Sequence, residues 1–451
     1  MPKIKNIFFA NTAETFASLL ESETSDKNAQ QERIRYENDL SQRAQFWGED
    51  SKVIVTPEPI PTALLENNSR RLGYKNVINL WPKESKLRLC VAIANDTVLK
   101  DKIVETIRAN PNIRISSYAA TEEYVDLIKM LQKEGTDFEV INLPHIVNPI
   151  HLVQKIGSKN GIREIIRGLF PREGIRLPDG YICKDKDEIL KAIPEFLNTN
   201  RGFVVKIHNG ESGWGVKIMN KETAQSLNKI FLTTWLNDLF QSDHIWKSAP
   251  YIVEEFILAD MTMAGGFPSG EGYADDKGFT FSYSCGQEVT PQGEFGGITI
   301  GKSFMSHFFN ESIETALNLV GNKLHNIGYR GIFDIDFVAG VDGNLYILEC
   351  NARMTGGTHV QGIISHLKIN TEQGPYIFSN DSYRYGEKVQ PPEKVLHSFS
   401  NLLYPIHGEE RGIIISFISS SRPVIGIIVI GNDSNDTRSL TEQVKSSLGG
   451  H

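Results

Sequence analysis

The sequence predicts a chain of mixed α/β and α+β class, organised in about three domains. Its 451 residues exceed the usual size of one hydrophobic core, which is roughly 150 residues. In the first third, short β-rich runs alternate with helical patterns, which is typical of a parallel sheet with crossover helices. Further along, glycine-punctuated β runs follow one another, and Asp342-Gly343 separates two of them as a hairpin turn does.

Composition excludes several classes of protein. Hydrophobic residues make up 40% and charged residues 23%, as in ordinary globular domains. The net charge is 47 − 55 = −8, so we predict no nucleic-acid partner and no membrane partner. The N-terminal "MPKIKNIFFANTAETF" turns polar too soon for a signal peptide. The cysteines lack any Cys-x-x-Cys spacing, which predicts reduced core thiols in a cytoplasmic protein: Cys90, Cys183, Cys285 and Cys350.

The N-terminal part, residues 1–147, is predicted to be an α/β domain. Amphipathic helices are expected over 96–109 and 121–134, between some of the β runs. The glycine fingerprint of a dinucleotide-binding turn is missing, so no NAD site is expected. The expected strands are "NIFFA", "KVIVT", "NVINLW", "LRLCVAIA", "IRISSY" and "FEVINL".

The central part, residues 148–392, is predicted to be a second domain, and residues 393–451 a small α+β cap. Residues 371–392 are polar and contain prolines, and we place the boundary to the cap near Pro392. The cap should contain two apolar strands and a helix over 440–448. In the central part we expect a helix from Lys159 capped by Ser158, helices over 186–198, 221–242 and 310–327, strands over 202–208, 250–257, 332–338 and 344–351, and a β section near 279–301.

The last hairpin carries the most informative residues. Glu349, Asn351 and Arg353 alternate along "ILECNARMTGG", so they share one face of a strand, and Asp334 and Asp336 share a face of its partner. Mg²⁺ prefers oxygen ligands and usually takes one or two carboxylates. We therefore predict that Asp336, Glu349 and Asn351 hold Mg²⁺. The alternative is a surface hairpin whose acidic side chains face water.

The run "GYRGIFDIDFVAGVDGNLYILECNARMTGG" resembles the metal-binding hairpin of ATP-grasp enzymes, especially the biotin carboxylase version. There an acidic residue on one strand is followed by Glu-x-Asn-x-Arg on the next, and Asp336, Glu349, Asn351 and Arg353 match these positions. Some ligases of the family keep a catalytic arginine two positions before the first acid, where this chain has Asp334. The resemblance therefore implies Arg353 as the residue that stabilises the reacting phosphate.

The resemblance also implies how ATP phosphates are bound. The segment "VVKIHNGESGWGVKI" has the form of the family's strand lysine followed by a glycine-rich loop, which gives Lys206 and residues 209–215. An ordinary hairpin turn is the alternative. "GSKNGIREIIRG" resembles the segment with an earlier phosphate-contacting lysine, Lys159, which could instead be a solvated lysine at a helix start. The loop residues expected at the phosphates are Ser212, Gly213, Trp214 and Gly215.

The strand "YIVEEFI" resembles the family's adenine-binding hinge. Glu254 is expected to accept a hydrogen bond linked to the adenine amino group, while the backbone at Glu255 and Ile257 binds the purine edge. Asp260, six positions past Glu254, matches the place of a ribose-binding acid in many relatives. The alternative is a plain strand with exposed glutamates.

Substrate contacts are expected at two further places. Glu288 is a candidate to orient or deprotonate an amine nucleophile, and Glu294 is interpreted as part of a polar β-turn. In "MTGGTHV", Gly356 and Gly357 could form a backbone nest for a substrate carboxylate, with help from His359.

The resemblance to ATP-grasp enzymes implies an ATP-dependent carboxylate-amine ligase that uses ATP and Mg²⁺. Lys206 and Arg353 are the expected catalytic residues, and Arg353 also contacts substrate. The enzyme would join a small carboxylate to an amino acid or peptide amine through an acyl phosphate, and a homodimer is possible. The whole layout resembles the pheganomycin-type peptide ligases. The alternatives are a biotin-carboxylase-like carboxyphosphate enzyme, although no Met-Lys-Met signature is present, and a non-catalytic ATP-binding regulatory protein.

Overall fold

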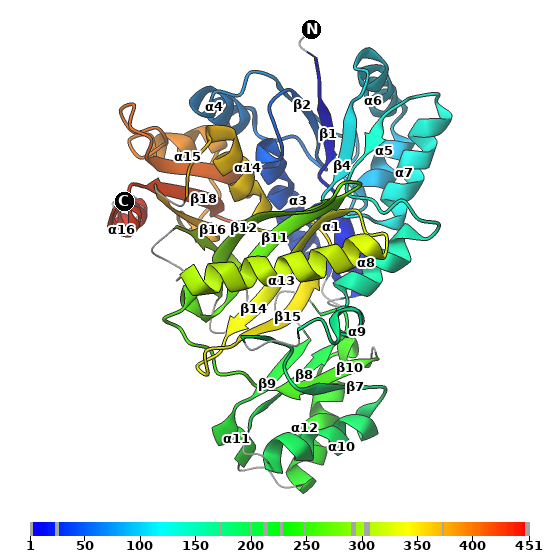
Figure 1. Ribbon diagram of the computed structural model, residues 1–451. Helices are drawn as coiled ribbons and strands as arrows, with labels where there is room; N and C mark the ends of the chain where they lie inside the picture. Colours follow the sequence, from blue (N-terminus) through cyan, green and yellow to red (C-terminus); the bar gives the residue numbers. More distant parts are fainter. Residues whose placement is uncertain are drawn as a thin grey trace. The chain divides into compact units, whose positions relative to one another are not determined.

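The chain, drawn as a ribbon in Figure 1, forms two compact units. The first comprises Met1–His145, Gly296–Ser303 and Arg353–His451, and the second Ile146–Phe295 and Phe304–Ala352. Residues 353–392 are thus grouped with the N- and C-terminal parts, and the domain boundaries at 147 and 392 stay a prediction. This computed structural model describes residues 3–22, 27–170, 174–198, 201–210, 215–225, 229–247, 249–289, 295–301, 307–371 and 374–446.

A five-stranded parallel sheet organises the start of the first unit, as the alternating pattern predicted. Its order is β3-β2-β1-β4-β5, and every neighbouring pair is parallel. The strands are β1 (Asn6–Phe9), β2 (Lys52–Val55), β3 (Val77–Leu80), β4 (Arg114–Ser117) and β5 (Glu139–Val140). The helices are α1 (Thr12–Thr15), α2 (Ala17–Ser22), α3 (Lys27–Leu40), η1 (Ser41–Phe46), α4 (Thr62–Leu72), α5 (Leu89–Asn95), α6 (Thr97–Ala109) and α7 (Glu122–Lys133).

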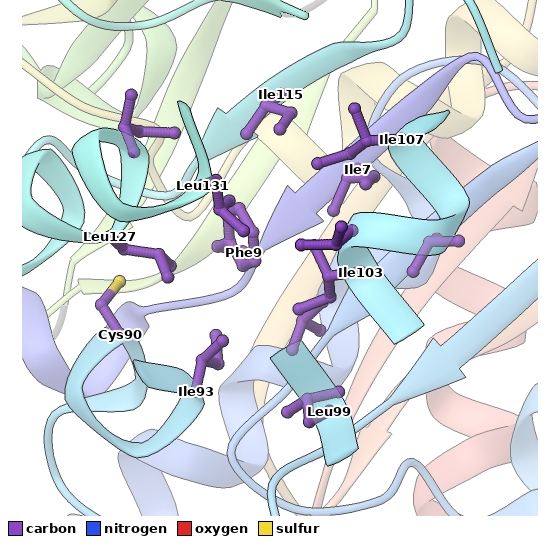
Figure 2. Packing of buried hydrophobic residues seen from close by; sticks show 14 of the residues in the cluster. Ile7, Phe9, Cys90, Ile93, Leu99, Ile103, Ile107, Ile115, Leu127 and Leu131 are labelled. Carbon is purple, nitrogen blue, oxygen red and sulfur yellow. The ribbon is translucent and has the colours of Figure 1, made fainter. Parts of the chain in front are cut away.

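The core of this sheet corrects one predicted strand. Figure 2 shows Ile7 and Phe9 of β1 packed with side chains from the helices, among them Cys90 and Ile93. The run "LRLCVAIA" was expected to be a strand, but it forms α5. Leu89 and Cys90 are adjacent, Ile93 follows about one helical turn later, and all three are buried. A short apolar run fits a strand and a helix equally well, so the periodicity could not decide.

The first unit also contains strands in the order β17-β18-β16-β13. β16 (Tyr376–Arg384) lies within the polar stretch 371–392, in which no strand was predicted. Its buried positions include Ser379 and Asp381, and this polar buried face conceals the strand in the sequence. The other elements are β13 (Phe295–Ile300), β17 (Gly412–Ile418), β18 (Val424–Gly431), α14 (Thr358–Leu367), α15 (Pro392–Ser398) and α16 (Ser434–Ser446).

In the second unit, a four-stranded sheet of order β7-β10-β8-β9 packs against helices on an apolar face. The predicted helix over 186–198 is confirmed as α10. The helix expected over 221–242 is present as α11 and α12, with residues 226–228 outside the described part. The elements are β7 (Gly180–Cys183), α10 (Lys186–Asn198), β8 (Phe203–Ile207), β9 (Val216–Met219), α11 (Lys221–Gln225), α12 (Lys229–Ser242), η2 (His244–Lys247) and β10 (Tyr251–Glu255).

The same unit contains strands in the order β12-β11-β14-β15-β6, and α13 lies across β11 and β12 (Figure 1). The predicted Asp342-Gly343 turn is confirmed, with Gly343 at φ +81° donating to the Gly340 carbonyl at 2.9 Å. The elements are α8 (Pro149–Gly157), α9 (Lys159–Ile166), β6 (Ile175–Arg176), η3 (Ala264–Gly266), β11 (Pro268–Asp275), β12 (Gly278–Val289), α13 (His307–Asn326), β14 (Gly331–Ala339) and β15 (Leu345–Asn351).

Two predictions from composition can be compared with the described residues. All four cysteines lie in the described part of the chain, where each is buried and none forms a disulfide, as expected of reduced core thiols. Among the helices of the described residues, none has the length and apolarity that crossing a membrane requires.

Candidate active site

The predicted metal residues lie together on the β14-β15 hairpin. The register sets Asp336 opposite Glu349 and Asp334 opposite Asn351. Asn351 Nδ2 donates to Asp334 Oδ1 at 3.0 Å and to Asp336 Oδ2 at 2.9 Å. Burial, followed by the charges of Asp334 and Glu349, raises the pKa of Asp336 well above its usual range. A bound divalent cation would offset this repulsion between carboxylates, so the residues fit such an ion.

The donor set is small but suitable for magnesium. In the described part of the chain, no group of three or more histidine, cysteine, aspartate and glutamate side chains is arranged to hold a metal. The predicted set consists of two carboxylates and one amide, and Mg²⁺ usually completes its shell with water and phosphate oxygens. The metal site therefore stays a prediction that the hairpin geometry supports.

Two adjacent polar residues of strand β12, Gln287 and Glu288, point to opposite faces of the sheet. Gln287 Nε2 donates to Asp336 Oδ1, so Gln287 supports the acidic group. Glu288 is exposed, and because side chains alternate along a strand it points to the opposite face from Gln287. The placement does not bring Glu288 to the acidic group, and its substrate role stays a prediction. Glu294 lies outside the described residues.

Lys159 joins three separate segments of the second unit. Its Nζ lies 2.5 Å from Glu349 Oε2 and donates to the Gly210 carbonyl, also at 2.5 Å. Its backbone N donates to the His208 carbonyl at 3.0 Å, and its residue is only 7% exposed. Ser158 caps α9 as predicted, accepting from Gly161 N. Lys159 is therefore not a solvated lysine at a helix start.

Lys206 belongs to a buried group of three charges. Its Nζ pairs with Glu254 Oε1, while Arg163 Nη1 lies 2.7 Å from Glu254 Oε2. All three residues are less than 9% exposed, and their formal charges sum to +1. Sequence reasoning did not identify Arg163. Its position one turn after Lys159 on α9 was the available signal, since residues four apart share a helix face.

The hinge glutamates are paired rather than exposed, which rules out the plain strand with exposed glutamates. Glu255 Oε2 lies 2.5 Å from Arg201 Nη1, and Ile257 follows the end of β10. Asp260 Oδ1 accepts from Thr262 Oγ1 at 2.6 Å and from Thr262 N at 3.0 Å, and these hydrogen bonds lower the pKa of Asp260. A carboxylate accepts more than two hydrogen bonds, so these contacts leave acceptor capacity for a ribose hydroxyl.

The end of the glycine-rich loop is defined by Gly215. It has φ +75°, and its carbonyl accepts from Ile207 N at 2.9 Å. A Cβ at this position would lie 2.4 Å from the Ile207 side chain, so both the backbone conformation and the close approach require glycine. Ser212, Gly213 and Trp214 lie outside the described residues.

The remaining predicted residues belong to the first unit. The Arg353 guanidinium lies 5.3 Å from the centre of the Phe16 ring, and the next residue, Met354, donates its N–H to the Tyr118 carbonyl. Gly356 and Gly357 precede α14, and Gly357 is its N-cap with φ −89°. Neither glycine has a positive φ among the described backbone angles, and the backbone nest expected at this position stays a prediction.

His359 lies in the interior of the first unit. It is 1% exposed, and burial, followed by the charge of Arg43, lowers the pKa of its imidazole well below the usual range. Its suggested help in binding a substrate carboxylate stays a prediction.

Two curated relatives are similar to the chain, and no family model matches it. The L-propargylglycine--L-glutamate ligase of Streptantibioticus cattleyicolor is 26% identical over 335 residues, covering 68% of this chain and 64% of the relative. The [butirosin acyl-carrier protein]--L-glutamate ligase of Niallia circulans is 25% identical over 216 residues, covering 46% of each. The matches thus span less than two thirds of the relatives' length.

Solved structures share the fold over the whole chain. Biotin carboxylase from Campylobacter jejuni, in complex with β-γ-ATP, has a TM-score of 0.57 at 12% identity and covers 99% of this chain and 92% of that one. N5-carboxyaminoimidazole synthetase from Staphylococcus aureus has a TM-score of 0.51 at 13% identity and covers 99% and 98%. The fold that the hairpin motif predicted is confirmed: the chain has the ATP-grasp fold, and the curated relatives that it resembles are ligases.

Proposed function

We propose that the chain is an ATP-dependent carboxylate-amine ligase that forms an amide bond through an acyl phosphate. The observation that carries this proposal is the Lys159 ammonium, which contacts the start of the glycine-rich loop at Gly210 and the acidic hairpin at Glu349. The start of the loop and one carboxylate of the hairpin, which are far apart in the sequence, thereby meet at the Lys159 ammonium. Such a cluster suits a nucleotide phosphate with its divalent cation.

The proposed metal and phosphate contacts follow from this cluster. Asp336, Glu349 and Asn351 would hold Mg²⁺, which when bound neutralises charge on the transferred phosphoryl group. Lys159 and Lys206 would bind phosphate oxygens. The buried group of Lys206, Arg163 and Glu254 carries a net positive charge, and a buried excess charge favours an anionic ligand.

The nucleotide contacts on either side of the phosphates are proposed from the resemblance. Residues 209–215, with Ser212, Gly213, Trp214 and Gly215, would cover the phosphates. The backbone at Glu255 and Ile257 would bind adenine, and Asp260 the ribose. Glu254 is buried between two cations, so we assign it to holding Lys206 and expect its contribution to adenine to come through its backbone.

The chemistry divides into two displacements. An oxygen of the substrate carboxylate attacks the γ-phosphorus, the bond to the β,γ-bridging oxygen breaks, and ADP leaves. The amine nitrogen then attacks the acyl carbon, phosphate leaves, and the nitrogen loses a proton. Positioning and charge neutralisation are the protein's main contributions. Arg353 is assigned to the reacting phosphate and substrate, and Glu288, Gly356 and Gly357 to substrate, from the sequence motif alone.

We propose L-glutamate as one of the two substrates. The names of both relatives contain L-glutamate, whereas their second substrates differ, one being propargylglycine and the other an acyl-carrier protein. The second substrate of this chain is left to experiment among amino acids and short peptides. A homodimer and a cytoplasmic location are retained as proposals, the former to be tested by light scattering.

The test measures ADP release with ATP, Mg²⁺ and L-glutamate, alone and with each amino acid or short peptide. We expect release that requires one particular pair, with a product mass equal to the sum of the two substrates minus water. Release with bicarbonate alone would favour a carboxyphosphate enzyme, and binding of ATP without release for any pair would favour a regulatory protein. A Glu349→Gln/Asn351→Ala double variant that remains folded is expected to lose turnover, and full turnover would reject the metal assignment.

A further inference from the structure

Asp334 is a buried carboxylate with no role in the proposed ligand set. It is 4% exposed and lies on β14 opposite Asn351. Each of its oxygens accepts a hydrogen bond: Oδ2 from Ser269 Oγ on β11, and Oδ1 from Asn351 Nδ2 on β15 at 3.0 Å. A buried carboxylate needs such donors, because desolvation penalises its charge. Asp334 thus connects three adjacent strands at the position where some ligases of the family have an arginine.

The amide of Asn351 offers different chemistry on its two sides. Its oxygen accepts and can bind a hard cation, whereas its NH₂ group only donates. An ionised carboxylate only accepts, so a carboxylate neighbour selects the NH₂ side. In the structure Nδ2 donates to Asp334 and also to Asp336, so the amide oxygen is directed elsewhere.

Only one of these two carboxylates can hold the amide while a metal is bound. Asp336 is itself a proposed ligand, so its oxygens would be engaged by the cation. Asp334 has both oxygens bonded to donors within the protein, and Mg²⁺ usually takes no more than two carboxylates. These facts favour Asp334 as a partner of the ligand rather than a ligand.

We propose that Asp334 is a positioning residue that fixes the orientation of the Asn351 amide, with its oxygen turned to the divalent cation. This inference rests on the proposed metal site. Outer partners of this kind typically change metal affinity by about 10- to 100-fold when removed.

Two substitutions separate this role from a direct role of the charge. In Asp334→Asn, the new amide oxygen can still accept from Asn351 Nδ2, while its NH₂ group donates to Ser269 Oγ, because a hydroxyl also accepts. The negative charge is lost, but the orientation of Asn351 is kept. In Asp334→Leu, a side chain of similar shape removes the acceptor as well.

The experiment measures Mn²⁺ affinity by electron paramagnetic resonance in the presence of ADP, on the full chain. We expect Asp334→Asn to change the Kd less than about threefold and Asp334→Leu to weaken it about 10-fold or more. In an Asn351→Ala background, Asp334→Leu should raise the Kd for Mn²⁺ by less than about a further twofold, because the amide to be oriented is then absent. Circular dichroism establishes that each variant is folded.

The outcomes separate the inference from the proposed function. A 10-fold loss in Asp334→Asn would overturn the positioning role, since orientation is kept and only charge is removed. The Mn²⁺ affinity of Asp334→Asn can still overturn the positioning role if the leucine variant does not fold. If Asn351→Ala leaves Mn²⁺ affinity unchanged, the metal assignment itself fails. If Asn351→Ala weakens binding but a folded Asp334→Leu does not, only the inference fails.

Discussion

Charges buried in the second unit occur in groups, and each member depends on the others. Glu254 accepts from both Lys206 and Arg163, so its removal leaves two cations without their carboxylate. Glu255, its neighbour on β10, pairs with Arg201, whose side chain is 32% exposed. The two adjacent glutamates thus offer a matched comparison between a buried and a partly exposed ion pair.

We predict that Glu254→Gln lowers the free energy of unfolding by about 3 to 5 kcal/mol, the range for breaking a buried pair. ATP affinity should fall as well, because Lys206 loses its partner. Urea denaturation and nucleotide titration measure the two effects. Glu255→Gln is the control, with an expected loss of about 1 kcal/mol or less. Equal losses in the two variants would show that burial does not distinguish these pairs.

His359 predicts a pH dependence of stability. Burial lowers its pKa in the folded chain well below the ordinary 6.5, so below pH 6.5 the unfolded chain binds a proton that the folded chain does not. The free energy of unfolding therefore falls as the pH falls from 6.5 toward the lowered value, by up to about 1.4 kcal/mol per pH unit. Burial raises the pKa of nearby Asp381, which acts in the opposite sense.

The difference between wild type and His359→Gln isolates the histidine. We expect the variant to lose less stability than wild type between pH 6.5 and 5, measured by urea denaturation at each pH. Exposed His151 provides the control substitution, which should leave the profile unchanged. Parallel profiles for wild type and His359→Gln would contradict the assigned cause.

At the scale of elements, the junction of α8 and α9 sets the position of Lys159. Ser158 ends α8 and caps α9, and Lys159 is the first residue of α9. Gly161 lies against the end of α8, where an added Cβ would be 2.0 Å from the Lys155 carbonyl oxygen. The close approach of the two helices thus requires glycine at position 161. At Gly157, by contrast, an added Cβ would have no atom within 4 Å.

Gly161→Ala is predicted to lower the free energy of unfolding by about 1 to 3 kcal/mol, the usual cost of overpacking. It should also weaken ATP binding, because α9 must shift and carries Lys159. Thermal unfolding and nucleotide titration test this. Gly157→Ala is the matched control, and its stability should stay level or rise by up to about 1 kcal/mol. If both alanine variants bind ATP normally, the junction does not position Lys159.

At the scale of the molecule, distant parts of the chain combine in the first unit. Side-chain amides near the N-terminus donate to the backbone of the C-terminal strand β17: Gln42 to the Ile418 carbonyl and Asn68 to the Ile415 carbonyl. Arg43 pairs with Asp381 of β16 at 2.7 Å, with both side chains no more than 10% exposed. The N-terminal and C-terminal parts therefore share one packed unit, which also holds Arg353 against Phe16.

We predict that Arg353→Ala lowers the single-turnover rate more than it lowers ATP affinity, since the proposed contact is to the reacting phosphate. Phe16→Leu should also lower the single-turnover rate, but by less, because the Phe16 ring lies against the Arg353 guanidinium and supports its position. In an Arg353→Ala background, Phe16→Leu should have no further effect on the rate. Weakened ATP binding with a normal single-turnover rate in Arg353→Ala would oppose its assigned role.

The sequence by itself determined the elements and motifs whose signals are local. Alternation along each strand set Asp334 with Asp336 and Glu349 with Asn351, and Ser158 marked the start of α9. The register irregularity that brings Asp336 opposite Glu349 is not encoded by the Asp342-Gly343 turn, because a regular ladder from that turn would place Asp336 opposite Leu348. The alternation of short β-rich runs with helical patterns also predicted the parallel sheet of the N-terminal part. Periodicity did not distinguish a helix from a strand in the short run that forms α5. It also did not predict β16, because the buried face of that strand carries polar residues.

Only the tertiary structure decided which charged groups meet. The pairing of Lys159 with Glu349 and of Arg163 with Glu254 joins residues far apart in the chain, so no sequence period encodes it. The same holds for Asp334, whose hydrogen-bond donors Ser269 and Asn351 lie on the two neighbouring strands. Buried charges are stable only with partners, and packing rather than the local sequence selects those partners.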